Sequence, residues 1–409
     1  MSRRRIAIVG AGPAGIMAAL EAARQGGHVT LFDTNEIVGR KLLVTGNGRC
    51  NISNVNAAAG TYTCAERTFL ETAFSLFGHE ETVTCLHELG IPTYATPDGW
   101  CYPLSNSAAT VADALAAMLD LAGVDVRLKT KVADIGTTGG KFTLTVGGGP
   151  RTQTVERVIV ASGGKAYPAL GSRGSLFPVL TRLGHAINPV RPALAPIIAD
   201  VKHLYKLQGV RLDVGLTLFE HGQVLGETVG NMMFTQFGFS GPAPMNLSHL
   251  VSANPGTTLI LSIDLLPHHR AELIDLITRM RSRPVPLRVI LGSVLPPKIA
   301  PVVIPLAKLP ADVCLADLLQ KDLDRLLHLL THLKAKVKDT RGFKFAQVST
   351  GGVSVSEVDP RTMESRIVPG LHFAGEVLDV VGPCGGYNLQ FAWTTGALAG
   401  SGAARGDKQ

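Results

Sequence analysis

The stretch RRIAIVGAGPAG at residues 4–15 decides the fold of this chain. An apolar run, Ile6–Val9, ends at Gly10, and Gly12 and Gly15 complete the spacing G-x-G-x-x-G. We interpret Gly10 as part of a tight turn and Gly12 as the point where the backbone approaches a pyrophosphate closely. Gly15 lets the following helix lie close to its strand. The sequence therefore predicts a phosphate-binding turn between a strand and a helix.

The residues after this turn complete a β-α-β unit. Apolar residues at helical spacing follow: Ile16, Ala19, Leu20 and Ala23. A second apolar run, His28–Phe32, ends at Asp33, whose carboxylate is placed to bind a ribose 2′-hydroxyl. The helix N-terminus offers free N–H groups to the phosphates. This order predicts a dinucleotide-binding α/β domain. It does not separate FAD from NAD, and the acid disfavours NADP.

Composition restricts the class of protein. The chain has 409 residues, of which 45% are hydrophobic and 17% charged, so it is expected to be globular with two or three domains. No run approaches the ~20 apolar residues that span a bilayer. The six cysteines contain no C-x-x-C pair, which argues against a disulfide framework, a zinc ribbon or a dithiol reductase. We expect a cytoplasmic protein with no metal site and no membrane association.

The net charge of +7 is spread along the chain, and the longest basic cluster is Arg3–Arg5. We interpret this charge as a solvated surface, so nucleic-acid binding is not expected from composition. The consecutive histidines His268 and His269 lack a metal-binding spacing partner. A small molecule is the expected partner.

Apolar periodicity predicts the remaining elements. Helices are expected at 65–77, 80–89, 110–122, 271–280, 315–330 and 387–399. Strands are expected at 124–128, 142–146, 158–161, 210–218, 257–263 and 371–374. Three segments are expected to be loops or connectors: 39–54, 92–103 and the proline-rich stretch near 284–310.

The predicted elements change along the chain from mixed helices and strands to alternating strands, then to helices, and then back to mixed elements. This order predicts the domains. Residues 1–190 and 348–409 form a discontinuous cofactor domain, residues 191–265 and 333–347 a β-barrel-like domain, and residues 266–332 a helical insertion. The predicted fold class is therefore α/β, with a Rossmann-like domain that carries an inserted barrel and a small helical domain.

The segment GEVLDVVGPCGGYNLQFAWTTGALAG, residues 375–400, is the second informative motif. An acid after a strand, here Glu376 after Gly375, commonly binds the ribitol chain of FAD. The glycine-rich turn at Gly386 then opens a helix at Asn388, whose N-terminus would stabilise negative charge on the flavin pyrimidine. This motif favours FAD over NAD.

Two further glycine-rich loops are expected to line the cofactor. The loop GRKLLVTGNGRCN, residues 39–51, can lie along a diphosphate and a flavin edge, with Arg40 or Lys41 balancing the phosphate charge. The strand at 158–161 runs into Ser162-Gly163-Gly164, which is typical of a buried parallel strand that ends beside a ligand.

Four stretches closely resemble the BaiN-like (YhiN-type) family of bacterial FAD-dependent oxidoreductases, which includes aminoacetone oxidase-like flavoproteins. They are residues 6–54, 161–174, 234–248 and 350–393. The resemblance implies an FAD domain of the two-dinucleotide type, an inserted β-barrel and a small helical domain. It also implies that Ala14, Asp33, Arg40, Gly46, Val132, Glu376, Asn388 and Leu389 contact FAD, with Val132 acting through its backbone.

The predicted cofactor-binding residues combine the motifs with this resemblance. They are Gly10, Gly12, Pro13, Ala14, Gly15, Asp33, Arg40, Lys41, Gly46, Val132, Gly163, Gly375, Glu376, Gly386, Asn388 and Leu389. The chain departs from the family in two places: Trp100-Cys101-Tyr102-Pro103 replaces an Arg-aromatic-Pro run, and Cys384 replaces a threonine before GGYN.

The expected reaction is hydride transfer between flavin N5 and a small molecule. Because no second G-x-G-x-x-G occurs in strand–helix context, NADH or NADPH would bind transiently over the flavin as donor. Candidate catalytic residues are Asn47, Arg49, Cys50, Cys384 and Tyr387. Two alternatives stay open: an RNA-modifying flavoprotein, and a regulatory protein that holds FAD without turnover.

Overall fold

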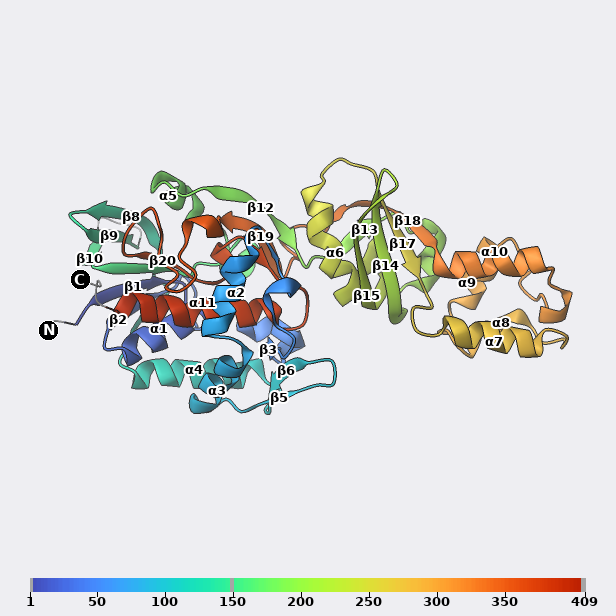
Figure 1. Cartoon of the computed structure of the whole chain (residues 1–409), viewed down its shortest axis with the longest axis horizontal. Helices are drawn as coiled ribbons and strands as arrows, with labels where there is room; N and C mark the ends of the chain where they lie inside the picture. Colours follow the sequence, from blue (N-terminus) through green and yellow to red (C-terminus); the bar gives the residue numbers. More distant parts are fainter. Residues whose placement is uncertain (1–2, 148–150, 406–409) are drawn as a thin grey trace. The chain divides into compact units, whose positions relative to one another are not determined.

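The computed structural model describes residues 3–147 and 151–405. The chain forms two compact units, one made of Met1–Arg191 with Gln347–Gln409 and the other of Pro192–Ala346 (Figure 1). Residues 1–2, 148–150 and 406–409 of the predicted cofactor domain lie outside the described residues. The second unit is therefore an insertion between two parts of the first.

A five-stranded parallel sheet forms the centre of the first unit. Its order is β20 (Leu371–Phe373), β11 (Arg157–Val160), β1 (Arg5–Val9), β2 (His28–Phe32) and β7 (Asp125–Arg127). The inner strands are almost wholly buried, which explains their continuous apolar sequences. The predicted Rossmann-like fold class is confirmed.

Two helices run side by side against this sheet, α1 (Pro13–Arg24) and α11 (Tyr387–Ala404) (Figure 1). They approach closely because α11 presents glycines: a Cβ at Gly396 would lie 2.4 Å from the carbonyl oxygen of Ala14. The carboxyl ends of the strands share one edge of the sheet. Gly10, Gly163 and Gly375 closely follow the ends of β1, β11 and β20, and the loop that starts at Gly39 comes after β2 and Asp33. That edge is where ligands of open α/β sheets bind.

Smaller elements surround the sheet. The helices are α2 (Arg67–Leu76), α3 (His79–Glu88), α4 (Ala108–Leu121) and α5 (Phe177–Arg182). An antiparallel meander consists of β8 (Val132–Thr138), β9 (Lys141–Val146) and β10 (Thr152–Val155). Two short pairs join β12 (Ile187–Ala193) to β19 (Val348–Val353), and β21 (Val380–Val381) to β4 (Thr63–Cys64).

The prediction of a loop at residues 92–103 is wrong. This segment forms a hairpin of β5 (Thr93–Ala95) and β6 (Trp100–Pro103), and β6 also pairs with β3 (Ser53–Asn54). Gly99 closes the turn with φ +83°. The paired residues, Asn54 with Trp100 and Ser53 with Cys101, are 46 and 48 positions apart in sequence, so periodicity within the segment does not reveal the pairing.

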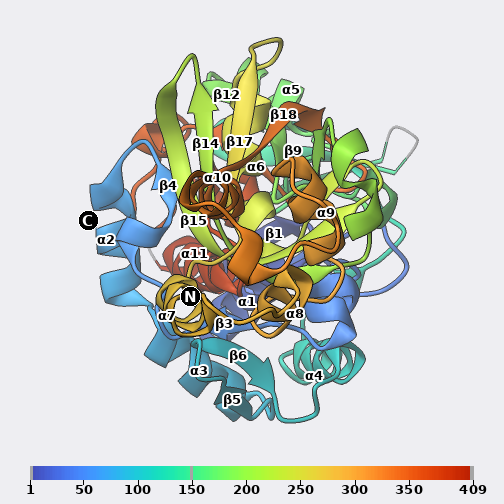
Figure 2. The same cartoon turned by 90° about the vertical axis from the view of Figure 1, so that its right-hand side faces the viewer.

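The second unit contains a closed six-stranded barrel. Its order is β13 (Ile197–Ala199), β16 (Gly238–Ser240), β15 (Gln223–Thr235), β14 (Arg211–Glu220), β17 (Leu259–Asp264) and β18 (Leu333–Thr340). Figure 2 shows β14, β17 and β18 as neighbours in the barrel. Alternate residues of β14 are buried, which agrees with the strict alternation in its sequence.

Helices complete this unit: α6 (Pro242–Ala253), α7 (Arg270–Met280), α8 (Leu287–Gly292), α9 (Ala300–Leu306) and α10 (Gln320–Thr331). The connector predicted near 284–310 therefore contains two helices. Pro286 is the N-cap of α8 and Pro301 lies at the start of α9, where a missing N–H costs nothing, while Pro305 lies inside α9 near its end. Within the described part of the chain, no helix is long and apolar enough to cross a membrane.

Candidate functional site

The glycine turn after β1 is built around two backbone contacts that exclude side chains. A Cβ at Gly10, where φ is +111°, would lie 2.3 Å from the carbonyl oxygen of Ala161. A Cβ at Gly15 would lie 1.8 Å from the carbonyl oxygen of Gly10. Gly12, by contrast, has no atom within 4 Å of its Cβ position, so the turn is open on that side. This is the geometry of a backbone cradle for a phosphate.

Asp33 is fixed at the end of β2 by the same turn. Its Oδ2 accepts a hydrogen bond from the N–H of Ala11 at 2.7 Å, and its Oδ1 accepts one from the N–H of Asn35 at 2.7 Å. A carboxylate has about four acceptor sites, so these bonds leave capacity for a ribose hydroxyl. The Asp33 carboxylate therefore fixes the conformation of the glycine turn. It also lies at the carboxyl edge of the sheet, where the ligand is predicted to bind.

Arg40 carries the observation that best tests the predicted cofactor. The N–H of Gly39 donates to the carbonyl of Ala11 at 2.8 Å, which brings Arg40 beside the glycine turn. The Nε of Arg40 is buried and has no hydrogen-bond partner among the residues that the structure describes, and Nη1 lies 3.8 Å from Glu36. A buried guanidinium N–H without a partner is costly, and a phosphate oxygen would satisfy it. The residues present therefore fit a dinucleotide.

Lys41 and Glu376 form an ion pair across the site. The Nζ of Lys41 lies 2.6 Å from Oε2 of Glu376, and both side chains are mostly buried. The other oxygen, Oε1, accepts hydrogen bonds from the N–H and Oγ of Ser349 at 2.9 and 2.8 Å. Lys41 thus balances a carboxylate in the structure, while Arg40 is left for a phosphate.

Ser349 on β19 is a site residue that the sequence analysis missed. Its Oγ also accepts a hydrogen bond from the N–H of Lys165 at 3.0 Å. A Cβ at Gly164 would lie 1.8 Å from that Oγ, which explains the small residue in the predicted glycine pair after β11. The serine precedes Thr350-Gly351-Gly352 in the sequence. This glycine-rich strand end was the sequence feature from which Ser349 could have been predicted as a site residue.

The turn before α11 is held by the side chain of Asn388 and lies against β3. The amide of Asn388 donates to the carbonyl of Gly382 at 2.8 Å and accepts from its N–H at 2.9 Å. A Cβ at Gly386, where φ is +93°, would lie 2.2 Å from the carbonyl oxygen of Ser53. Asn388 therefore shapes the turn, and its contact with a flavin ring edge stays a prediction.

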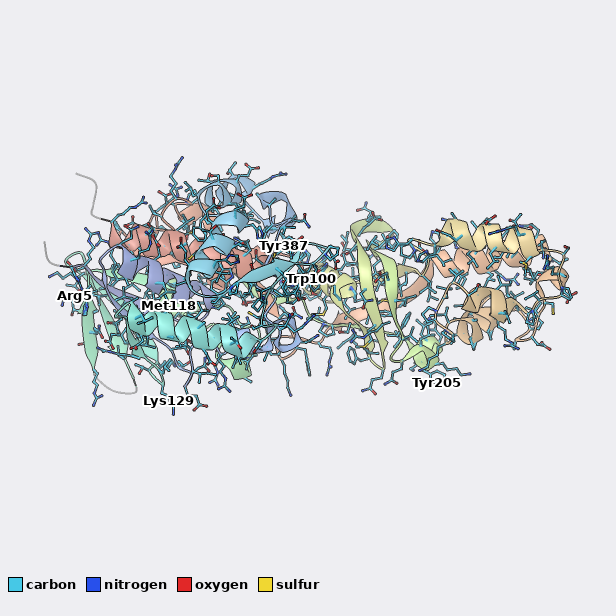
Figure 3. The ribbon with its side chains drawn as sticks, turned by 90° about the horizontal axis from the view of Figure 1, so that it is seen from below. Arg5, Trp100, Met118, Lys129, Tyr205 and Tyr387 are labelled. Atoms are coloured by element: carbon cyan, nitrogen blue, oxygen red, sulfur yellow. The ribbon has the colours of Figure 1, made fainter. Side chains whose placement is uncertain are left out.

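Trp100 packs against the same turn. A Cβ at Gly385 would lie 2.9 Å from the indole Nε1 of Trp100, and the carbonyl of Gly385 accepts from the amide of Asn54 at 2.8 Å. Figure 3 labels Trp100 and Tyr387 in this region. One of the two places where the chain departs from the family it resembles, the β6 strand, thus contacts the other, the turn that contains Cys384.

The candidate catalytic residues occupy different environments. Arg49 lies over the ring of Tyr102, 4.6 Å from its centroid, and donates to its hydroxyl at 3.3 Å. Asn47 is exposed and adopts φ +56° in the 3₁₀ segment Leu42–Gly48. The carbonyl of Tyr387 accepts from the hydroxyl of Tyr62 at 2.8 Å, and burial raises the pKa of Tyr387.

Cys50 and Cys384 are thiols rather than thiolates at neutral pH. Burial raises the pKa of Cys50 to about 11 and that of Cys384 to about 12. Because the thiolate is the nucleophile, we expect both cysteines to resist iodoacetamide in the folded protein at pH 8 and to react once it is unfolded. Mass spectrometry of the alkylated peptides measures this. Rapid labelling of Cys384 in the folded protein would show that its thiol is reactive and would restore it as a candidate nucleophile.

The other predicted residues surround the same edge of the sheet. Gly375 approaches Ala14 so closely that a Cβ would lie 2.8 Å from the Ala14 methyl. A Cβ at Gly46, where φ is +56°, would lie 2.9 Å from the N–H nitrogen of Asn51. Pro13 begins α1, Gly163 (φ +70°) follows β11, Val132 is buried at the start of β8, and Leu389 lies in the first turn of α11. Their contact with FAD stays a prediction.

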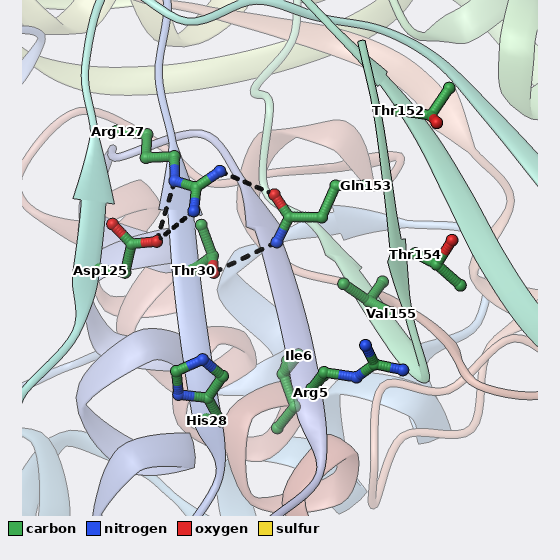
Figure 4. A pocket seen from close by; sticks show the side chains of 10 residues that line it. All are labelled: Arg5, Ile6, His28, Thr30, Asp125, Arg127, Thr152, Gln153, Thr154 and Val155. Carbon is green, nitrogen blue, oxygen red and sulfur yellow. Dashed lines mark hydrogen bonds and ion pairs between the residues drawn. The ribbon is translucent and has the colours of Figure 1, made fainter.

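A separate polar cavity of about 330 Å³ is lined by residues of β1, β2, β7 and β10 (Figure 4). Two of its charged groups are paired with each other: Arg127 contacts Asp125 at 2.7 Å, and it also donates to Gln153 at 2.9 Å. None of the predicted site residues lines it. Within residues 3–147 and 151–405, no cluster of three or more potential metal ligands occurs.

Comparison with known proteins identifies relatives over the whole chain. The family model described as "HI0933-like protein Rossmann domain" matches residues 4–402. A 3-dehydro-bile acid delta(4,6)-reductase from Clostridium scindens is 34% identical, covering 98% of this chain and 99% of that protein. A ribosomal RNA dihydrouridine synthase from Escherichia coli is 32% identical, covering 97% and 96%.

Among solved structures, a 3-ketosteroid-delta4-(5alpha)-dehydrogenase from Rhodococcus jostii matches with a TM-score of 0.51 at 14% sequence identity. The match covers 98% of this chain and 97% of that one. At this identity the likeness concerns the fold alone, and it agrees with the Rossmann-like architecture described above.

Proposed function

The chain belongs to the HI0933-like Rossmann family and is an FAD-dependent oxidoreductase; from this premise we propose that it reduces a carbon–carbon double bond conjugated to a carbonyl group in a small molecule. The expected resemblance to the BaiN-like family is confirmed by the reductase relative. We further propose NADH or NADPH as the electron donor. The physiological reaction would then add a hydride and a proton across the double bond.

The names of the relatives support this reaction class. A delta(4,6)-reductase saturates ring double bonds, and a dihydrouridine is a uridine whose ring double bond has gained two hydrogens. In both cases the double bond is conjugated to a carbonyl group, so hydride adds to the carbon remote from the carbonyl and the proton to the nearer one. One flavin chemistry therefore serves two very different molecules.

The described residues supply binding and orientation for this chemistry. The open side of Gly12 and the free Nε of Arg40 would hold the pyrophosphate, and Glu376 the ribitol hydroxyls. FAD, when bound, supplies hydride transfer at its N5 position. Arg49 would orient the substrate carbonyl with the guanidinium N–H groups that its bonds to Gly46 and Tyr102 leave available. Tyr387, whose pKa is raised by burial, keeps its proton at neutral pH and is the candidate proton donor at this turn.

The single structural observation that supports FAD as the cofactor is the buried Nε of Arg40, which lacks a partner among the described residues next to the glycine turn, whereas the reaction class rests on the reductase relative. We expect the purified protein to carry FAD that bleaches when NADH or NADPH is added without oxygen. Addition of a cyclic enone should then restore the oxidised spectrum. In the Arg40→Ala variant FAD affinity should fall about tenfold or more, because a charge-assisted hydrogen bond is lost.

The outcomes separate the alternatives. FAD that is reduced by NAD(P)H but reoxidised only by oxygen would contradict the proposed substrate class. FAD that neither donor reduces would assign the electrons to another reductant. Unchanged FAD affinity in Arg40→Ala would show that the buried guanidinium does not contact the cofactor.

A second candidate function is reduction of uracil in RNA. Two relatives are named ribosomal RNA dihydrouridine synthases, the second being 30% identical, from Haemophilus influenzae, over 95% of each chain. The positive charge also favours this candidate. Residues 192–346 contain 17 Lys and Arg against 12 Asp and Glu, so this inserted unit carries most of the excess. Polyanions bind such surfaces by displacing counterions.

A further inference from the structure

Strand β18 presents three lysines on one face of the barrel. Its sequence LKAKVKDT alternates strictly: Leu333, Ala335 and Val337 are buried in the barrel core, while Lys334, Lys336 and Lys338 are exposed. Since alternate side chains of a strand point to one side, the three ammonium groups share the outer surface. In the described part of the chain none of the three forms an ion pair.

The neighbouring strands place an apolar platform beside these lysines. Lys336 is opposite Ile260 on β17, which is opposite Phe219 on β14, and both of these side chains are half-buried. Val224 on β15 pairs with Phe219 and is 54% exposed. Cations therefore border a surface of aromatic and aliphatic groups.

The basic surface continues past the end of β18. The guanidinium of Arg341 lies 3.5 Å from the ring centroid of Phe345 and 4.4 Å from that of Phe237. Lys344 lies 5.8 Å from the Phe345 centroid. Arginine stacked on aromatic rings is a common base- and phosphate-binding arrangement.

The acidic groups near this surface are few and partly engaged. Asp339 follows the third lysine and accepts a hydrogen bond from the N–H of Thr340 at 2.6 Å. Glu227 on β15 accepts from the hydroxyl of Thr217 at 3.0 Å. Asp200, beside β18, accepts from the N–H of Lys202. The surface as a whole keeps an excess of positive charge.

We propose that this lysine face, defined as Lys334, Lys336, Lys338 and Arg341 with Phe219 and Ile260, binds the phosphodiester backbone of RNA. The inference rests on the second candidate function for the identity of the polyanion. Lysines in a row neutralise successive phosphates, and the apolar platform accepts an unstacked base. An anionic membrane fits less well, because membrane-binding faces insert large apolar side chains, whereas Phe219 and Ile260 are half-buried between strands.

The test compares two triple variants of the full-length, FAD-loaded protein. The first, Lys334→Gln with Lys336→Gln and Lys338→Gln, removes charge from the lysine face. The matched control, Lys298→Gln with Lys308→Gln and Lys321→Gln, removes the same charge from exposed lysines of the helical segment. The probe is a fluorescein-labelled RNA oligonucleotide with single-stranded uridines, and fluorescence anisotropy measures its affinity over a range of salt concentrations.

We expect the wild-type protein to bind this RNA and the lysine-face variant to bind it about tenfold more weakly or worse. The slope of log affinity against log salt should fall by about two, as loss of three phosphate contacts to a single strand predicts. The control variant should stay within about threefold of wild type. An equal loss of RNA affinity in both triple variants would show that net charge alone explains the effect, and this would overturn the proposal.

Two further outcomes are decisive. Absence of RNA binding by the wild-type protein overturns the proposal, as does binding to phosphatidylserine vesicles that the lysine-face variant loses while RNA binding persists. Reduction of FAD by NAD(P)H and of a cyclic enone by the enzyme is measured on the same preparations. If enone reduction is intact and RNA binding fails, only this inference is lost; if RNA binds and no double bond is reduced, the proposed function fails instead.

Discussion

Replacement of Gly15 by alanine is expected to destabilise the first unit strongly and to abolish FAD binding. The new methyl group would lie 1.8 Å from the carbonyl oxygen of Gly10 and 3.3 Å from the Ala161 methyl. The nearest atom belongs to the backbone of a tight turn, so a rotamer change cannot relieve the overlap. We expect the free energy of unfolding to fall by about 3 kcal/mol or more, measured by urea denaturation of the cofactor-free protein.

A neighbouring glycine provides the informative contrast. Gly12 has a φ of −80° and no atom within 4 Å of its Cβ position, so Gly12→Ala should leave the stability of the cofactor-free protein unchanged. Its methyl group would instead occupy the space expected for the pyrophosphate and should lower FAD affinity at least about tenfold. Gly292→Ala, equally open but in the second unit, should alter neither property. Full FAD affinity in Gly12→Ala would contradict the assigned cradle.

Replacement of Glu376 by alanine is expected to have the second-largest effect. The change removes the acceptors of the Ser349 N–H and hydroxyl and leaves the Lys41 ammonium without its partner. Since both members of the ion pair are mostly buried, we expect a loss of about 2 kcal/mol in the free energy of unfolding. FAD occupancy should fall as well, because the carboxylate is the predicted ribitol ligand.

Two variants distinguish these effects. Glu376→Gln keeps the volume and an acceptor for Ser349 but loses the charge, so its stability and FAD content should lie between those of wild type and Glu376→Ala. Glu71→Gln removes a carboxylate from an exposed pair with Arg67 on α2 and serves as the control, with a change within about 0.5 kcal/mol. Bound FAD is quantified from the absorbance of the released chromophore. A Glu376→Ala protein that retains all its FAD would show that the C-terminal motif is misread.

Much of the cofactor domain was predictable because its strands are buried on both faces. The segments that became β1, β2, β11 and β20 are mostly apolar runs that lead into Gly10, Asp33, Gly163 and Gly375. Such strands can be predicted without knowledge of tertiary contacts, because burial on both faces requires apolar residues along most of their length. The barrel strand β14 was equally predictable, because apolar residues alternate with other residues along its sequence. These patterns determined the fold class before any contact was known.

Charge distribution was not predictable from composition. The excess of basic residues is spread along the sequence, which argued against a concentrated basic surface. The barrel changes that interpretation, because β18 buries every second residue and so brings Lys334, Lys336 and Lys338 to one face. The row of half-buried Ile260 and Phe219 beside them depends on strand register, which the sequence of one strand does not contain.

By itself the sequence determined which elements form and which motifs follow the strands at the ligand edge. Only the tertiary structure decided how adjacent, equally charged residues divide their roles: Lys41 pairs with Glu376, 335 residues away, whereas the Nε of Arg40 is buried without a partner. The physical reason is that local patterns report which side chains are buried, while a buried polar group is satisfied by whichever element the fold brings beside it. Ser349, invisible as a site residue in the sequence, was assigned by that contact alone.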